Sequence, residues 1–307
     1  SARLGGIRLA GGLQGLAWRD AGLVGTVGGE RPADVSTRRA GSFEIHPGAG
    51  GTLASGDGGF HHFFLRLVVG ASNVPHAEIL EKAKPLLEKK GIELEVKKFQ
   101  DYVLPNKSLA DKDLDANYFQ HIPYLEKEIK DKKYDFEVAG KIHLEPIGVY
   151  SQKYKSLKEL PDGATIIMSN SVADHGRGLA ILQKEGILKI KDGVDPVSAT
   201  PKDIADNPKN LKFKTDIEPG LLPQVYNNKE GDAVLINSNY AIDAKLNPEK
   251  DAIAIEGNDS PYANIVAVRK GDKDKKEIKA LVEVLHSKEI EDFINKEYKG
   301  AVVPVKE

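Results

Sequence analysis

Cysteine is absent from the 307 residues, which excludes disulfide bonds, thiolate metal ligands and a cysteine nucleophile. The formal net charge is -2, so the chain lacks the bulk positive field that holds nucleic acid or anionic lipid. No apolar run reaches the ~18 residues that a membrane-spanning helix needs. The 40% of hydrophobic and 29% of charged residues are typical of a globular chain, and the length allows about two domains.

The motifs of common enzyme classes are also missing. The sequence holds no GxxxxGKS or GxxxxGKT loop, no GxGxxG loop, no GxSxG elbow and no HExxH pair. The histidines after residue 66 stand singly, without metal-ligand spacing. We therefore expect no catalytic residue, no metal and no cofactor. His143 and Glu145 share one face of a strand-like segment, and we favour a structural hydrogen-bonded pair over the acid and base of a lyase or transferase.

Lysine is absent from residues 1–66, whose basic side chains are seven arginines. From Leu67 onward, 35 lysines accompany only two arginines, Arg177 and Arg269. The first segment is rich in glycine and alanine and shows no sustained helical or strand period. We interpret residues 1–66 as a low-complexity leader foreign to the rest of the chain. A genuine irregular extension, or an arginine-rich segment that contacts RNA, are the alternatives.

From Leu67 the hydrophobic pattern alternates between the periods of strands and helices. Apolar runs predict buried strands at 67–71, 164–168, 233–236 and 265–268. Spacings of three and four predict helices with one buried face at 79–87, 122–129 and 276–298. Such alternation is typical of mostly parallel sheets covered by helices. We expect an α/β fold of two lobes, with ligand bound in the cleft between them at the carboxyl ends of the strands.

Arg177 is the first candidate for ligand binding. It follows the strand at 164–168 and the loop at 169–176, so we expect it at or near a helix N-terminus. A guanidinium holds a carboxylate through two parallel hydrogen bonds, and helix N-termini favour anions. The alternative is a surface ion pair with Asp174. Arg269 is expected at a solvated strand end.

Amide and aromatic side chains provide further candidates. The segment 117–124 gathers amide, aromatic and imidazole groups, as a small-molecule pocket does, although partly buried aromatics at a helix start are equally compatible. Asn237 and Asn239 follow the strand at 233–236, and Asn264 precedes the strand at 265–268. Amides donate and accept, so they can orient the ammonium and carboxylate of an amino acid, or simply cap a helix.

Long motifs make residues 67–307 similar to a known family. They are VPHAEIL at 74–80, DANYFQHIPYLE at 115–126, HLEPIGVYS at 143–151, LPDGATI at 160–166, INSNYAI at 236–242 and SPYANIVAVRKG at 260–271. On these motifs the segment resembles the NlpA-type lipoproteins, the methionine-binding proteins of bacterial ABC importers, in versions from low-GC Gram-positive bacteria.

The resemblance implies a type II periplasmic-binding-protein fold, in which two α/β lobes close over a ligand by hinge motion. We expect residues 67–150 and 258–307 in lobe 1 and residues 151–257 in lobe 2. The implied partners are L-methionine or D-methionine and the membrane permease and ATPase subunits of an ABC importer, with the binding protein a monomer that binds no nucleic acid. Family members carry a signal peptide and a lipidated cysteine; this sequence has neither, and we expect both in the native, extracytoplasmic and lipid-anchored protein.

The resemblance also implies individual roles. The aromatic pocket for the methionine thioether falls on Tyr102, Phe119, His121 and Tyr124. The carboxylate-binding arginine falls on Arg177, and the asparagines that hold the amino-acid backbone fall on Asn237 and Asn264. Many relatives carry an amide where this chain has Asp174, whose carboxylate can pair with an ammonium or shift the preference towards a dipeptide such as Gly-Met. Behind this set we expect supporting roles for Asn117, His143, Glu145, Asn170 and Asn239.

Overall fold

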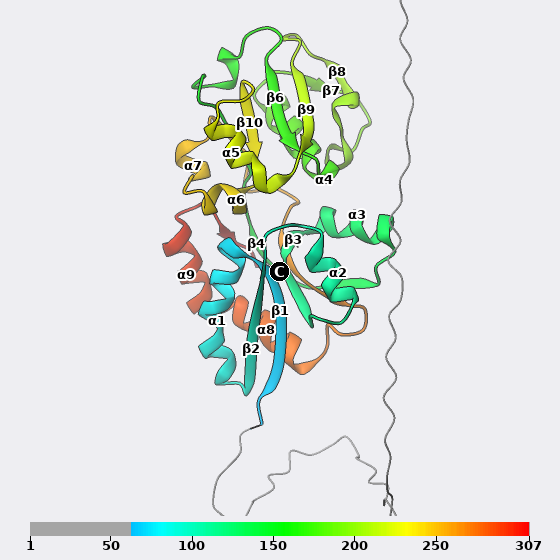
Figure 1. Ribbon diagram of the computed structural model, residues 1–307, viewed down its shortest axis with the longest axis vertical. Helices are drawn as coiled ribbons and strands as arrows, with labels where there is room; N and C mark the ends of the chain where they lie inside the picture. Colours follow the sequence, from blue (N-terminus) through cyan, green and yellow to red (C-terminus); the bar gives the residue numbers. More distant parts are fainter. Residues whose placement is uncertain (1–62, 307) are drawn as a thin grey trace, which may run out of the picture. The chain divides into compact units, whose positions relative to one another are not determined.

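The computed structural model describes residues 63–306 (Figure 1). The expected leader at 1–66 therefore lies outside the described residues except for its last four positions. Of these, Leu65 and Arg66 already belong to strand β1 (Leu65–Ser72), because they pair in parallel with Ile92 and Glu93. Strand β1 of the α/β fold thus starts two residues before Leu67, where the composition changes.

Lobe 1 is built on a six-stranded sheet with the order β13-β4-β12-β3-β1-β2. Besides β1, its strands are β2 (Ile92–Phe99), β3 (Ala116–His121), β4 (Phe136–Leu144), β12 (Asn264–Arg269) and β13 (Val303–Pro304). Strand β1 is parallel to β2 and β3, whereas β12 is antiparallel to β3 and β4. The expectation of mostly parallel sheets is wrong here, because β12 starts at Asn264, opposite His121 and His143, where β3 and β4 end.

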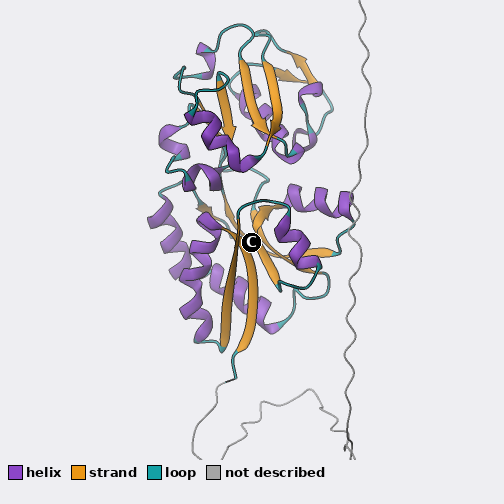
Figure 2. Cartoon of the chain, viewed as in Figure 1, coloured by secondary structure: helices purple, strands orange, loops and turns teal. Residues whose placement is uncertain are grey.

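Helices cover both faces of this sheet (Figures 1 and 2). They are α1 (Glu78–Glu88), α2 (Leu104–Ala110), α3 (Ile122–Lys132), α8 (Lys276–Leu285) and α9 (Lys288–Tyr298). Buried Ile79, Leu281 and Ile290 belong to the core under α1, α8 and α9, and Leu109 and Leu125 to the core under α2 and α3. A distorted helical turn, η1 (Asn73–Ala77), with a cis bond between Val74 and Pro75, leads from β1 into α1.

Lobe 2 holds a five-stranded sheet with the order β11-β5-β10-β6-β9. Its strands are β5 (Gly148–Tyr150), β6 (Thr165–Ser169), β9 (Lys212–Ile217), β10 (Ala233–Ile236) and β11 (Ala254–Ile255), and β7 (Lys189–Ile190) pairs with β8 (Ile204–Asp206) beside it. Strands β9, β6 and β10 are parallel, and β5 is antiparallel to β10 and β11. Since β5 lies in this sheet, the lobe boundary comes before residue 148 and not at residue 150, where we expected it.

The helices of lobe 2 are short apart from one. They are α4 (Val172–Lys184), α5 (Leu222–Asn227), α6 (Ser238–Asp243) and α7 (Pro248–Asp251), with single turns η2 (Leu157–Glu159), η3 (Pro196–Ser198), η4 (Pro201–Asp203) and η5 (Pro219–Leu221). At Gly176 in α4 an added Cβ would lie 2.1 Å from the carbonyl oxygen of Pro196, so only glycine permits this close approach of η3. Within residues 63–306, no helix combines the length and apolarity needed to cross a bilayer.

The chain crosses between the lobes twice, at 145–147 and at 256–263. Both crossings join the two sheets within one compact unit. Strands β3 and β4 end, and β12 begins, beside these crossings. In lobe 2, β6 leads into α4 and β10 leads into α6. Side chains that follow these strand ends are thereby brought to the boundary between the lobes.

Candidate functional site

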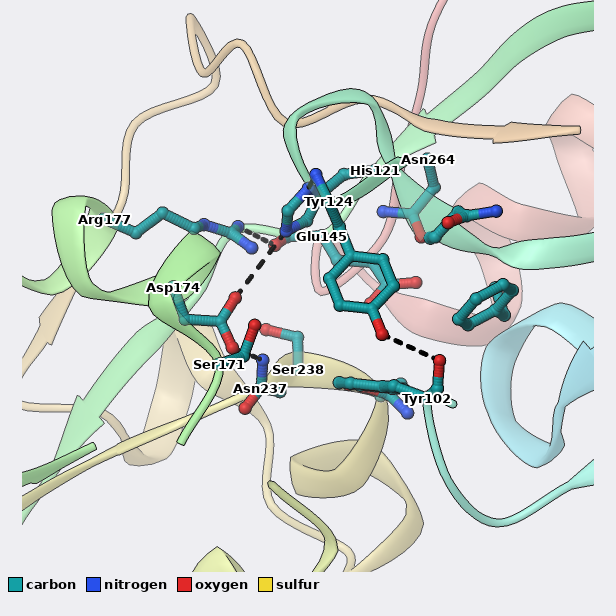
Figure 3. Close-up of a pocket in the computed structure, with 13 residues that line it drawn as sticks. Tyr102, His121, Tyr124, Glu145, Ser171, Asp174, Arg177, Asn237, Ser238 and Asn264 are labelled. Carbon is teal, nitrogen blue, oxygen red and sulfur yellow. Dashed lines mark hydrogen bonds and ion pairs between the residues drawn. The ribbon is translucent and has the colours of Figure 1, made fainter. Parts of the chain in front are cut away.

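A narrow cavity of about 30 Å³ lies between the lobes (Figure 3), smaller than the roughly 300–1,000 Å³ common for small-molecule sites. Thirteen residues line it: Tyr102, Phe119, Gln120, His121, Tyr124, Glu145, Ser171, Asp174, Arg177, Asn237, Ser238, Asn239 and Asn264. All eight residues expected to contact the ligand are among them. Of the five supporting residues, Glu145 and Asn239 also line the cavity.

An aromatic wall closes one side of the cavity. The ring of Tyr102 lies 6.2 Å from that of Phe119, 6.1 Å from that of Tyr124 and 5.3 Å from that of Tyr240, centroid to centroid. The Tyr124 hydroxyl donates to the backbone carbonyl oxygen of Tyr102 at 2.8 Å, which holds the Tyr124 ring in place. The Tyr102 hydroxyl donates to Oδ1 of Asn239 and so joins lobe 1 to lobe 2. This wall offers rigid apolar contact to an uncharged side chain.

Arg177 is held by a partner that sequence reasoning missed. Its Nε and Nη2 donate to the two carboxylate oxygens of Glu256 at 2.9 and 2.7 Å, and Nη2 also donates to the carbonyl oxygen of Glu145 at 3.0 Å. The guanidinium carbon lies 4.4 Å from the ring centre of Tyr262. Burial alone would lower the pKa of Arg177, but Glu256 raises it above its usual value, so the side chain is a permanent cation.

Two expectations about Arg177 and its segment are therefore wrong. Helix α4 begins at Val172, so the loop that we expected at 169–176 forms helix from Val172 onward, although Arg177, in the second turn, is near the helix N-terminus as expected. The surface ion pair with Asp174 is also excluded, since Arg177 is buried and pairs with Glu256.

Asp174 is the centre of a second polar cluster. Its Oδ2 accepts from Nδ2 of Asn237 and from Oγ of Ser169, both at 2.8 Å, and its Oδ1 lies 3.6 Å from Nε2 of His121. Burial opposes ionisation of this carboxyl, but His121, Arg177 and the Asn237 amide lower its pKa to about 2. Burial lowers the pKa of His121, with Asp174 acting in the opposite direction. Asn237 occupies the N-cap position of α6 without a side-chain capping bond, so its expected alternative role as a cap is wrong.

Two buried histidines contact the carboxylate of Glu145. Its Oε1 lies 2.7 Å from Nε2 of His143 and 3.1 Å from Nε2 of His76, and Nδ1 of His143 is hydrogen-bonded to the Tyr118 hydroxyl. The hydrogen-bonded pair expected for His143 and Glu145 is confirmed. Burial raises the pKa of Glu145, but His76 and His143 outweigh it and hold this pKa well below its usual range. His76 was missed, because one histidine in VPHAEIL carries no spacing signal.

The remaining supporting residues lie outside the cavity lining. Asn117 is buried behind it, where its Nδ2 donates to Oδ1 of Asn106 at 2.9 Å, and Asn106 in turn exchanges hydrogen bonds with Gln120. Asn170 is exposed and borders a neighbouring groove. Arg269 ends β12 as expected but is only partly exposed, because its Nη1 donates to the carbonyl oxygens of Leu109 and Leu114 at 2.8 and 2.6 Å.

Known proteins resemble this chain over nearly all of its described length. The methionine-binding lipoprotein MetQ of Bacillus subtilis is 59% identical over 243 residues, which are 78% of this chain and 88% of that protein. The crystal structure of a putative methionine-binding lipoprotein from Bacillus subtilis, also 59% identical, superposes with a TM-score of 0.77 over 79% of this chain and 98% of its own. A nutrient-binding protein from Burkholderia cenocepacia, solved bound to methionine, is 43% identical, with a TM-score of 0.74 over 78% of this chain and 100% of its own.

These neighbours confirm the periplasmic-binding-protein fold expected from the motifs. The family model that matches the sequence is that of the NlpA lipoproteins, and it covers residues 67–306. The chain belongs to the NlpA lipoprotein family.

Proposed function

We propose that this protein captures methionine outside the cytoplasm and delivers it to an ABC importer. The observation that carries the proposal is the division of one interlobe cavity into an aromatic side and a charged side. Methionine has the same division, since an uncharged thioether is joined to a zwitterionic backbone. The relatives whose names specify methionine support the same ligand.

The aromatic side fits the thioether. Contacts between sulfur and aromatic rings contribute about 0.3–1.5 kcal/mol each, and burial of the side chain adds about 1.5–3 kcal/mol. Tyr102, Phe119 and Tyr124 present rings with centroids 6.0–6.2 Å apart, so a flexible chain can contact more than one of them. The phenol groups stay neutral, because burial raises the pKa of Tyr102 and Tyr124 far above its usual value.

The charged side fits the zwitterion. The bonds from Arg177 to Glu256 use Nε and Nη2, which leaves Nη1 to donate to the carboxylate of the amino acid. Asp174 and Glu145 are ionised at neutral pH and provide acceptors for the ammonium. The amides of Asn237 and Asn264 complete the set from opposite lobes, so that ligand contacts both lobes.

The rest of the proposal follows from the family. A lipid anchor outside the cytoplasm would hold the protein, as a monomer, beside the membrane permease and the ATPase subunits. We assign no catalytic role to His143 and Glu145, because His143 is fully buried and both of its ring nitrogens are engaged, by Tyr118 and Glu145. A dipeptide such as Gly-Met is not favoured, since a relative was solved with methionine itself.

Native mass spectrometry of the purified protein tests the proposal. The complex is released by denaturation and the small molecule that separates is identified. A released mass equal to that of methionine supports the proposal. A larger methionine-containing mass favours the dipeptide instead. If the protein is empty and no titrated methionine binds, the proposal is wrong.

A further inference from the structure

His76 does not line the cavity itself, but it contacts two residues that do. It lies in η1 and is 1% exposed. Its Nε2 is 2.8 Å from Oδ1 of Asn264 and 3.1 Å from Oε1 of Glu145. The ring is packed edge-on against Tyr118 with 4.8 Å between centroids, and it lies 5.1 Å from His143. Its position is therefore defined by packing as well as by hydrogen bonds.

The partners of His76 determine where its proton lies. Both neighbours of Nε2 are oxygen acceptors, so Nε2 carries the hydrogen and donates it. Its Nδ1 is buried without a hydrogen-bond partner among the described residues. The geometry thus places the hydrogen that these two acceptors share on Nε2.

This proton fixes the polarity of Asn264. Its Oδ1 accepts from His76, and a flipped carboxamide would set an NH2 group against the N–H of the ring. The carboxamide therefore keeps Nδ2 as the end that His76 does not engage. Because Asn264 lines the cavity, it enters the site as a donor, which is the polarity that a ligand carboxylate needs (Figure 3).

The same proton helps to fix the polarity of Glu145. The hydrogen bonds from His143 and His76 both fall on Oε1. They favour the ionised carboxylate and leave Oε2 for another donor. Glu145 also lines the cavity, so it enters the site as an acceptor, which is the polarity that an ammonium needs.

We propose that His76 is a positioning residue of the amino-acid site, which orients Asn264 as a donor to the carboxylate of the ligand and Glu145 as an acceptor for its ammonium. This inference rests on the proposed function.

His76, His143 and Glu145 also form a group whose ligand atoms lie within 4.8 Å of one another, close enough to hold a metal ion. A metal would require Nε2 to lose the proton that the two acceptors use, so the two arrangements exclude each other.

Calorimetric titration of two variants and one control tests the proposal. His76→Leu removes the donor, and His76→Gln restores an N–H near the position of Nε2. His286→Leu removes a histidine that is hydrogen-bonded to the carbonyl oxygen of Lys141, away from the cavity. The ligands are L-methionine, 4-(methylsulfanyl)butanoate, which lacks the ammonium, and 3-(methylsulfanyl)propylamine, which lacks the carboxylate.

We expect His76→Leu to weaken methionine binding at least tenfold and to reduce the preference for methionine over both analogues. His76→Gln should recover most of the affinity, and His286→Leu should leave it unchanged. A loss by the same factor for all three ligands, or no loss, would overturn the positioning role while leaving methionine binding intact. If the wild-type protein binds no methionine, the proposed function itself fails.

A second measurement applies if His76→Leu does not fold. Nitrogen-15 spectra of the wild-type imidazoles should show His76 protonated at Nε2 and bare at Nδ1. A ring protonated at Nδ1, or a stoichiometric metal ion in the purified protein by elemental analysis, would overturn the proposal.

Discussion

Arg177 and Glu256 form a buried ion pair with two parallel hydrogen bonds, of 2.9 and 2.7 Å, between α4 of lobe 2 and the second crossing between the lobes. The Glu256 carboxylate accepts hydrogen bonds from Nε and Nη2, so it binds one edge of the guanidinium. The guanidinium lies over the ring of Tyr262. The pair therefore holds the guanidinium in one orientation and connects α4 to the segment that joins the lobes.

Glu256→Ala should destabilise the protein markedly. Removing one partner of a buried pair costs about 3–5 kcal/mol, because the other charge is left without compensation. We expect the free energy of unfolding in urea to fall by this amount, and methionine binding to weaken because the guanidinium is no longer fixed. The exposed pair of Lys288 and Asp292 provides the control, since Lys288→Ala should change stability little. Equal effects of the two substitutions would show that the buried pair has no special role.

Replacement of Arg177 should affect ligand binding most. Arg177→Ala is expected to weaken methionine binding at least tenfold, because the donors to the ligand carboxylate are lost. The double variant Arg177→Gln with Glu256→Gln avoids an unpaired buried carboxylate and should lose affinity similarly. A dissociation constant unchanged in both, measured by calorimetry, would remove Arg177 from the site.

Tyr102→Phe tests the contact between the lobes. The hydroxyl of Tyr102 donates across the lobe boundary to Asn239, and a hydrogen bond of this kind contributes about 0.5–1.5 kcal/mol. We expect methionine binding to weaken by roughly threefold to tenfold, since closure of the lobes loses that contribution. Tyr226→Phe, in α5 and outside the cavity lining, should bind as the wild type does. Identical affinities for Tyr102→Phe and the wild type would contradict this role.

Acid should destabilise the protein in two stages. Burial lowers the pKa of His121 and His143 below 6.5, so the unfolded chain takes up protons first and stability begins to fall below about pH 6.5. The pKa of Asp174 is lowered from 3.8 to about 2, so its contribution of roughly 2 kcal/mol is present above about pH 4 and lost as the pH falls towards 2.

Urea unfolding between about pH 7 and pH 2 measures both stages. Asp174→Asn should reduce the lower stage, since the asparagine does not titrate, and should enlarge the upper one, since the pKa of His121 falls further without Asp174. A stability that stays constant or rises on acidification would contradict the assignment of these groups.

Most of the elements could be predicted because their hydrophobic periods are local. Strands β1, β6, β10 and β12 coincide with the apolar runs, and α1, α3, α8 and α9 with the helical spacings. The direction of β12 could not be predicted from the sequence, because it depends on where the chain returns from lobe 2 and not on any residue within the strand. The boundary at residue 150 was wrong for the same reason, as β5 pairs with strands that lie 80 residues or more further along the chain.

Some residues of the site could likewise be predicted from the sequence, and others could not. The cavity residues carried by long motifs, such as Phe119 and Asn264, could be named from the sequence. Glu256 could not be named, because a buried partner of Arg177 some 80 residues away leaves no mark on local spacing. Tyr262 was not named although it lies in the motif at 260–271, since its contact with Arg177 depends on the fold. His76 was missed although its motif was recognised, since its effect is exerted through Asn264 and Glu145.

Titration of L-methionine and of Gly-Met into the wild-type protein, followed by calorimetry, tests the central claim most directly. The account predicts one methionine bound per chain and binding of Gly-Met at least tenfold weaker, because the interlobe cavity is narrow and a dipeptide needs more room than methionine. No binding of methionine, or a preference for Gly-Met, would contradict it.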